Sequence, residues 1–220
     1  MADPSLTICS DLVCVIDDDS DIRAALDSLL RSAGFKVRTF ECPQHYLASE
    51  GAEQAACLLL DIRLNGSNGL DFQQELLDRG FNVPVILMTG HGDIRMTVRG
   101  MKAGAVNFLA KPCGDADLLG AVSEAVTLDR TRRAAGRGER DARRLYDTLT
   151  PREREVMSLV TAGLLNKQVA GRLGVSEITV KIHRGNMMRK MGAPSLADLV
   201  RMAETLGVRE VTAARFAAYA

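Results

Sequence analysis

Apolar and polar positions follow two different periods along the first half of the chain. Five short apolar runs, rich in Val, Leu and Ile, predict strands over residues 12–16, 36–40, 56–60, 84–88 and 106–109. Between them, apolar residues recur at helical spacing and predict helices over residues 22–33, 44–49, 70–79, 94–103 and 116–128. Continuous apolar strands that alternate with helices are typical of a parallel sheet covered on both faces. We therefore predict a doubly wound α/β domain with five parallel strands over residues 11–127.

The pattern changes after residue 128. Residues 128–149 contain seven arginines and offer no strong apolar face, which predicts a charged, partly helical linker over 128–148 with weak points at Gly136 and Gly138. A nucleic-acid-binding arm is the alternative for this stretch. Thr150 and Pro151 then form a helix-start pair. The remainder predicts a small all-α domain over residues 149–211, with helices over 151–162, 166–173, 176–191 and 195–206.

Charge divides the chain in the same place. Residues 1–127 hold 18 acidic and 10 basic residues, a net charge of −8, whereas residues 128–220 hold 10 acidic and 18 basic residues, a net charge of +8. This asymmetry indicates an acidic module joined to one that binds a polyanion, either nucleic acid or an acidic protein. The chain has no run of 18 apolar residues and no signal-peptide pattern at its start. We therefore expect a cytoplasmic protein without membrane contact.

Cysteine usage favours packing over chemistry. The five cysteines are scattered and form no CxxC pair, and the three histidines complete no zinc spacing. We expect small, packed apolar residues of a reduced compartment at Cys9, Cys14, Cys42, Cys57 and Cys113.

Candidate chemistry lies where the predicted strands end. Asp17, Asp18 and Asp19 follow the first strand, Asp61 closes the third, Thr89 closes the fourth and Lys111 follows the fifth. The carboxyl ends of parallel strands meet at one edge of the sheet, so these side chains are expected to converge. Converging acids need a cation, and a set of oxygen ligands favours Mg²⁺ (or Mn²⁺).

Such a set suits phosphoryl transfer to a carboxylate. Asp61 would attack, Lys111 and the metal would neutralise phosphoryl oxygens, and Thr89 would donate a hydrogen bond. An aspartate at a strand end is commonly a helix N-cap, but features at four successive strand ends are harder to explain in that way.

The segments VIDDDSDIR, LLLDIRL, MTGHGD and MKAGAVNFLAKP, with their spacing, resemble the receiver domain of response regulators of the FixJ/NarL type. The resemblance covers about residues 11–128 and implies the flavodoxin-like receiver fold. It implies that Asp61 is the phosphoacceptor and that Asp17 and Asp18 form the acidic pocket.

The same resemblance implies that Asp18, Asp61 and the backbone carbonyl of Arg63 hold Mg²⁺. Thr89 and Phe108 would be the switch pair, and the Lys111–Pro112 peptide would be cis. The family usually has proline four residues after the phosphoacceptor. Here that position is Asn65, which with Gly66 also suits a turn.

The segment KQVAGRLGVSEITVKIHRGNMMRKMG predicts a helix, a glycine turn and a second helix. On a helical wheel, one face of the second helix is expected to pack inward, with Val180, His183, Met187 and Met191. The opposite face is basic, has short side chains near its start and suits a major groove; its residues are Ile178, Lys181, Ile182, Gly185 and Arg189. The alternative is that this face is an ordinary solvated surface.

The motifs TPRE, NKQVA, LGVS and TVKIHR resemble the LuxR-type helix-turn-helix DNA-binding domain over about residues 149–207. The resemblance implies base contacts from Lys181, Ile182 and the Gly185 position. It also implies phosphate contacts from Thr179, Arg184 and Lys190.

Together the two resemblances imply a transcriptional regulator of a two-component system that is not itself an enzyme. A sensor histidine kinase would phosphorylate Asp61, and the face around residues 96–104 and 106–119 would then favour a homodimer. The dimer would bind double-stranded promoter DNA at two half-sites, with RNA polymerase as a further candidate partner.

Two alternatives remain at this point. The chain could be a DNA-binding regulator with a silent receiver, controlled by a ligand or by redox state. It could also be a metal-dependent phosphotransfer enzyme, although no substrate-pocket motif accompanies the acids. The complete set of residues at the predicted sheet edge argues against a silent receiver and favours a regulator controlled by phosphorylation; the set is Asp17, Asp18, Asp61, Thr89 and Lys111.

Overall fold

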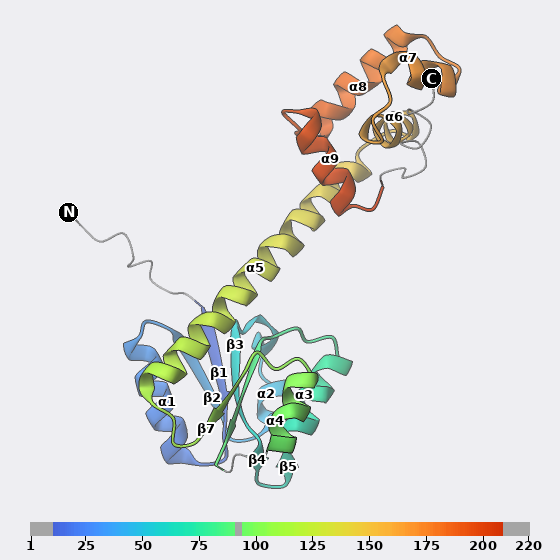
Figure 1. The fold of residues 1–220 in the computed structure, drawn as a ribbon. Helices are drawn as coiled ribbons and strands as arrows, with labels where there is room; N and C mark the ends of the chain where they lie inside the picture. Colours follow the sequence, from blue (N-terminus) through green and yellow to red (C-terminus); the bar gives the residue numbers. More distant parts are fainter. Residues whose placement is uncertain (1–10, 91–93, 209–220) are drawn as a thin grey trace, which may run out of the picture. The chain divides into compact units, whose positions relative to one another are not determined.

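The computed structural model describes residues 11–90 and 94–208, and the chain divides into two compact units, Met1–Arg132 and Arg133–Ala220. The first unit contains a five-stranded parallel sheet in the order β2-β1-β3-β6-β7 (Figure 1). Its strands are β1 (Leu12–Ile16), β2 (Lys36–Phe40), β3 (Cys57–Asp61), β6 (Val85–Thr89) and β7 (Asn107–Ala110). The predicted five-stranded, doubly wound fold is confirmed.

Helices cover both faces of this sheet. One face packs against α2 (Pro43–Leu47), α3 (Gly69–Asp78) and α4 (Ile94–Lys102), and the other against α1 (Ser20–Ser32) and the start of α5 (Asp115–Asp147). A short 3-10 helix (Ala52–Gln54) precedes β3, and a small hairpin, β4 (Arg63–Leu64) with β5 (Ser67–Asn68), follows it. The central strands β1, β3 and β6 are mostly apolar because side chains on both of their faces are buried, whereas the edge strand β2 exposes three of its five residues.

Two of the predicted cysteine positions lie in these cores. Cys14 and Cys57 are fully buried, and burial raises the pKa of the Cys14 thiol to about 11. They act as small apolar residues. Cys9 lies outside the described residues.

The helix predicted to end at residue 128 instead continues to Asp147 as α5, through both Gly136 and Gly138. A Cβ at either glycine would meet nothing within 4 Å, so neither glycine marks a close contact. Two ion pairs stabilise the helix beyond residue 128: the buried Asp129 pairs with Arg132, and Arg130 pairs with Asp11 at 2.5 Å. The stretch is helical, and the predicted weak points at Gly136 and Gly138 do not interrupt the helix; its role as a linker stays a prediction.

The second unit is helical. It contains the end of α5, then α6 (Pro151–Thr161), α7 (Asn166–Leu173), α8 (Glu177–Met191) and α9 (Leu196–Thr205). The end of α5 does have an apolar face, contrary to expectation, since Ala142, Leu145 and Tyr146 pack into the core that α6, α8 and α9 share.

Helix ends in this unit follow local rules. Thr150 and Glu153 form a reciprocal capping box at the start of α6, and Ser176 and Ser195 cap α8 and α9. Gly174 ends α7 with a left-handed φ of 64°, which makes the turn into α8. Among the described helices, none is both long and apolar enough to cross a membrane.

Candidate functional site

The loop after β1 carries three consecutive aspartates with different local roles. Asp17 is fully buried; its N–H donates to the Phe40 carbonyl (3.2 Å), and its Oδ1 accepts from the Asp19 N–H (3.0 Å). Asp19 is the N-cap of α1 and accepts hydrogen bonds from two N–H groups of the first turn, at 2.8 and 3.2 Å. Such a cap stabilises the start of a helix. Asp19 is therefore occupied by α1, and Asp17 and Asp18 remain as candidates for the site.

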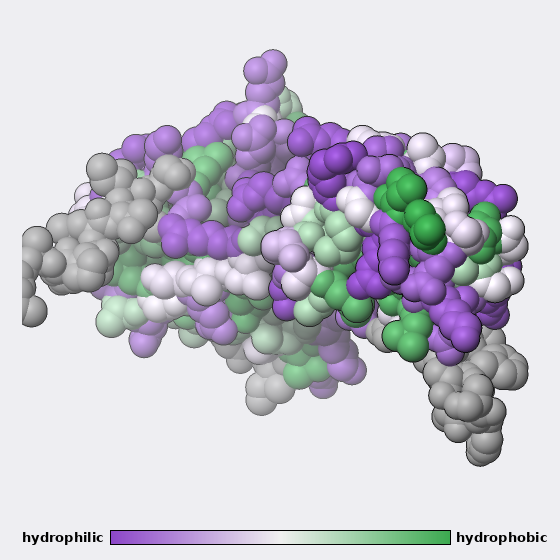
Figure 2. Space-filling view, turned by 90° about the horizontal axis from the view of Figure 1, so that it is seen from above, coloured by the Kyte–Doolittle hydropathy of each residue, from purple (hydrophilic) through white to green (hydrophobic). Residues whose placement is uncertain are grey.

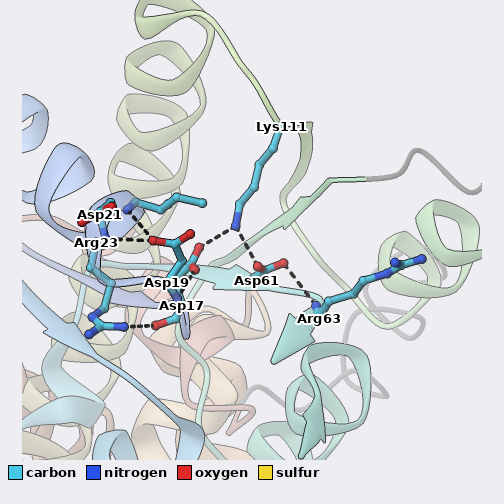
Figure 3. A network of polar contacts seen from close by, with 8 residues as sticks. Asp17, Asp19, Asp21, Arg23, Asp61, Arg63 and Lys111 are labelled. Atoms are coloured by element: carbon cyan, nitrogen blue, oxygen red, sulfur yellow. Dashed lines mark hydrogen bonds and ion pairs between the residues drawn. The ribbon is translucent and has the colours of Figure 1, made fainter. Parts of the chain in front are cut away.

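Lys111, which follows β7, reaches carboxylates at the ends of two other strands (Figure 3). Its Nζ lies 2.5 Å from Asp17 Oδ2 and 2.7 Å from Asp61 Oδ2. Asp61 is 7% exposed, so solvent screens these ion pairs only weakly. One ammonium group thus bridges the acids that β1 and β3 bring to the sheet edge.

Burial and ion pairing act in opposite directions on these groups. Burial raises the pKa of the Asp17 carboxyl above its usual value, although hydrogen bonds from Lys111 and the Asp19 N–H act to lower it. Burial would lower the pKa of Lys111, but its hydrogen bonds to Asp17 and Asp61 raise it above its usual value. Lys111 is therefore cationic at neutral pH.

Three carboxylates meet at this edge. Asp17, Asp18 and Asp61 each offer an oxygen, and these oxygens lie within 4.8 Å of one another. Clustered buried acids are unfavourable unless cations neutralise them, and Lys111 supplies one charge for three acids. The ligand set holds only carboxylate oxygens, which suits a hard divalent ion such as Mg²⁺ or Mn²⁺. The residues fit such an ion.

A tight hairpin follows Asp61. Asn65 and Gly66 form its turn, and Gly66 has a φ of 79°, a conformation that favours glycine. The Asn68 side chain then caps α3 by accepting a hydrogen bond at 2.9 Å. A Cβ on Gly69 would lie 2.2 Å from the backbone oxygen of Asp61, so this glycine permits a close approach. The hairpin therefore forms with asparagine where proline is usual.

Thr89 and Phe108 lie on neighbouring strands. Thr89 is the last residue of β6 and is fully buried. In the register of β6 and β7, Thr89 pairs with Ala110 and Leu87 pairs with Phe108. Since residues two apart in a strand share a face, Phe108 lies on the same face as Ala110, next to Thr89 along the sheet. The half-buried Phe108 packs against the core on the side of α2, α3 and α4.

In the second unit, helix α8 has apolar residues on two faces. Val180, Met187 and Met191 are buried, and His183 is half-buried, as the helical wheel predicts. The outer face is exposed: Ile178 is 71% and Ile182 is 58% exposed. The other exposed residues of this face are Lys181, Gly185 and Arg189.

Among the large apolar side chains that are exposed in the described residues, Ile178 and Ile182 are two of the three most exposed, with Leu165. In the face that Figure 2 shows, hydrophobic residues form small separate patches on a mostly hydrophilic surface. An exposed isoleucine pair beside lysine and arginine is therefore a feature of the surface that requires an explanation.

Two of the basic residues on α8 have partners on other helices of the unit. Lys190 Nζ lies 2.7 Å from Glu153 Oε2, and Arg184 donates to Asn166 Oδ1 at 3.1 Å. Burial acts to raise the pKa of Glu153, but hydrogen bonds from Lys190 and Thr150 bring it below its usual value. Glu153 is 4% exposed, so its ion pair with Lys190 joins the start of α6 to the end of α8 at a largely buried position.

Comparison with protein families matches both units. Residues 13–123 match the family of response regulator receiver domains, and residues 147–203 match the bacterial regulatory proteins of the luxR family. The chain is a response regulator. It belongs to the FixJ/NarL type, with a LuxR-type DNA-binding domain, and is a transcriptional regulator of a two-component system.

Relatives of this response regulator match over most of their length. Nodulation protein W of Bradyrhizobium diazoefficiens is 52% identical over 90% of this chain and 87% of its own. Response regulator protein TodT of Pseudomonas putida is 41% identical over 89% and 86%. FixJ of Rhizobium meliloti is 39% identical over 87% and 94%.

Solved structures agree. The response regulator StyR is similar with a TM-score of 0.80 and 44% identity, over 89% of this chain and 99% of that one. Full-length FixJ from B. japonicum is similar with a TM-score of 0.55 and 35% identity, over 92% and 100%.

The structure of this response regulator brings the predicted receiver residues together. Asp17, Asp18, Asp61 and Lys111 lie at one edge of the sheet, and the Lys111–Pro112 peptide is cis as predicted. The Arg63 N–H donates to Asp61 Oδ1 at 3.1 Å, while the role of the Arg63 carbonyl as a metal ligand stays a prediction.

Three further residues support these sites but were not identified from the sequence: Arg23, Gly69 and Glu153. Arg23 donates to a backbone carbonyl and Gly69 allows a close approach, and neither contact leaves a signal in spacing or periodicity. Glu153 could have been noticed, since T-x-x-E before an apolar run is a capping-box signature. Its ion pair with Lys190 depends on the fold.

Proposed function

We propose that Asp61 accepts a phosphoryl group from a sensor histidine kinase and that this modification controls binding of promoter DNA by the second unit. The observation that carries the proposal is the Lys111 bridge between Asp17 and Asp61, beside a carboxylate cluster that fits a divalent ion. A lysine held between two buried acids at a sheet edge suits the stabilisation of a charged transferring group.

In the proposed reaction, an Asp61 carboxylate oxygen attacks phosphorus, and the bond between phosphorus and the imidazole nitrogen of the donor breaks. Lys111 Nζ, now 2.7 Å from Asp61 Oδ2, is placed to turn to a phosphoryl oxygen. Asp17, Asp18 and Asp61 would hold Mg²⁺, with the Arg63 carbonyl as a further ligand. The ion would neutralise charge on the phosphoryl oxygens.

The phosphoryl group adds a charge of about −1.5 to −2 beside Thr89. We propose that the Thr89 hydroxyl donates to it and that Phe108 repacks in response. Helix α4 and the start of α5 then favour a homodimer. Val98 and Met101 on α4 are 47% and 45% exposed, which provides apolar surface for this contact.

The dimer would place two α8 helices on half-sites about one helical turn apart. We propose that Lys181, Ile182 and Gly185 approach bases, with Ile178 beside them. Thr179, Arg184, Arg189 and Lys190 are proposed to contact the phosphate backbone. RNA polymerase remains a candidate partner of the bound dimer.

The direct test is phosphorylation of the full-length chain with acetyl phosphate and Mg²⁺. On a Phos-tag gel we expect a slower band for wild type and for Asp78→Ala, a matched change at an exposed aspartate of α3, but none for Asp61→Ala. Affinity for DNA fragments selected with the phosphorylated protein should rise at least about tenfold with phosphorylation.

Two outcomes would contradict the proposal. A shifted band that persists in Asp61→Ala would move the phosphoacceptor elsewhere. DNA affinity that is identical with and without acetyl phosphate would favour a regulator with a silent receiver.

A further inference from the structure

The backbone between the two acids of the β1–α1 loop is held by a side chain from α1. Arg23 Nη1 donates to the carbonyl oxygen of Asp17 at 2.7 Å, in a partly buried position (Figure 3). Arg23 lies one turn into α1, and the contact spans six residues. A charged donor makes this bond stronger than an ordinary backbone hydrogen bond.

That carbonyl belongs to the peptide that joins Asp17 to Asp18. Because a peptide is planar, rotating it would turn the Asp18 N–Cα bond and shift the Asp18 carboxylate. Asp17 itself is fixed on several sides: its N–H donates to Phe40, and its carboxylate accepts from Asp19 and Lys111. Asp18 is half-buried and offers one of the three clustered ligand oxygens. Arg23 thus restrains the peptide that positions Asp18, the least buried of the three clustered aspartates.

We propose that Arg23 is a positioning residue for the divalent-ion site, acting through the Asp17 carbonyl to hold the Asp18 carboxylate beside Asp61. This inference rests on the proposed function, because it assumes that the carboxylate cluster binds a divalent ion. Loss of a group that positions the ligands of a metal commonly weakens metal affinity by about 10- to 100-fold.

A positioning role and a purely electrostatic role predict changes of opposite sign. Arg23 is a cation close to the acids, so its charge alone repels a divalent ion, and removing that charge would strengthen binding. If Arg23 holds the loop, removing it weakens binding, because the ligands must be ordered when the ion binds. The sign of the change therefore decides between the two roles.

The test is a titration of the full-length chain with Mn²⁺, in which electron paramagnetic resonance measures the free aquo ion. We expect the Kd for Mn²⁺ to rise about tenfold in Arg23→Met. In Arg23→Lys, which restores a charged donor, we expect partial recovery.

Arg31→Met is the matched control. Arg31 also lies on α1 and also donates to a backbone carbonyl, that of Val37 at 2.7 Å, but it is outside the carboxylate cluster. We expect its Mn²⁺ affinity to equal that of wild type. The Tm of each variant is measured without metal, to show that the variant is folded. If Arg23→Met is poorly folded, the Mn²⁺ affinity of Arg23→Lys can still be compared with that of wild type.

An Arg23→Met chain with wild-type Tm that binds Mn²⁺ equally well or more tightly would overturn the inference while leaving the proposed function intact. A wild-type chain that binds no Mn²⁺ at millimolar concentration would instead overturn the proposed ion site.

Discussion

The two candidate sites of this response regulator are assembled in opposite ways. At the receiver edge, Lys111 contacts Asp17 and Asp61, which lie 94 and 50 residues away in sequence, and all three groups are largely buried. On α8, the residues proposed to bind DNA come from one short stretch of a single helix, and its outer face is exposed.

The difference determines how each site should respond to change. Buried charges that share one lysine are strongly coupled, so the loss of one member affects the others. Exposed residues of a helix act more independently, and their interactions with DNA weaken with salt. A single substitution in the receiver site should therefore abolish most of its activity, whereas each substitution on the outer face of α8 should reduce DNA affinity by a small amount.

The largest effect is expected for Lys111→Met, which leaves the Asp17 and Asp61 carboxylates without their shared cation. The rate of phosphorylation by acetyl phosphate should fall about 100-fold, because a donor to the transferring group typically stabilises the transition state by about 2.7–4 kcal/mol. A Phos-tag time course measures this rate. Lys36→Met, at an exposed position of β2, serves as the control. Equal phosphorylation rates for Lys111→Met and Lys36→Met would contradict the proposed role of Lys111.

The next effect concerns packing against the backbone of Asp61. Gly69→Ala places a Cβ 2.2 Å from the Asp61 backbone oxygen, and we expect it to destabilise the receiver unit by about 2–3 kcal/mol. Hydrogen exchange of the β1 and β3 peptides in the full chain reports on this unit. Gly120→Ala on α5, where a Cβ meets nothing within 4 Å, should be neutral or slightly stabilising. Unchanged protection of β3 in Gly69→Ala would argue against the close approach.

Glu153→Gln tests the buried ion pair of the DNA-binding unit. We expect a loss of about 2 kcal/mol in stability at neutral pH, because Lys190 loses its charged partner. The pKa of Glu153 is lower in the folded state than its usual value, so its stabilising contribution is present above about pH 4.5 and is lost as the pH falls through the folded pKa.

The stability difference between wild type and Glu153→Gln should therefore shrink as the solution is acidified, as followed by hydrogen exchange of α6 and α8 peptides. Glu155→Gln removes only an exposed pair with Arg152 and should change stability by less than about 1 kcal/mol at any pH. A difference for Glu153→Gln that does not depend on pH would rule out its ionised state as the cause.

The smallest effect is expected at the isoleucines of α8. Apolar side chains in a major groove contact the methyl group of thymine. In a DNA site selected with the phosphorylated chain, replacing a contacted thymine by deoxyuridine should weaken binding about 3- to 5-fold, because one methyl group is worth about 0.8 kcal/mol.

Ile182→Ala should bind the thymine and deoxyuridine sites equally, and Leu196→Ala, an exposed position of α9, should keep the preference for thymine. An Ile182→Ala chain that still prefers thymine would place this contact elsewhere, without affecting the proposal that α8 binds DNA.

Most of the fold could be predicted from local pattern. The five strands of the parallel sheet lie within one residue of their predicted bounds, although the hairpin strands β4 and β5 were not predicted, and Asn166–Leu173 is the predicted range of α7. The inward and outward faces of α8 also follow from the helical period alone. These features depend on neighbours in the sequence, where apolar periodicity and capping residues carry enough information.

The continuation of α5 could not be predicted in this way. Residues 128–149 are rich in arginine and contain two glycines, which locally disfavour a helix. The burial of Asp129, the pair between Arg130 and Asp11, and the packing of Ala142 come from partners elsewhere in the fold. Tertiary contacts outweigh propensity here.

By itself, the sequence determined which residues stand at the strand ends and which helix presents a basic face, because both follow from short-range periodicity. Tertiary structure alone decided that Lys111 bridges two acids and that Lys190 pairs with Glu153. The reason is physical: a hydrogen bond or ion pair depends on distances of about 3 Å, and only the packed sheet and helices set those distances between residues far apart in the chain.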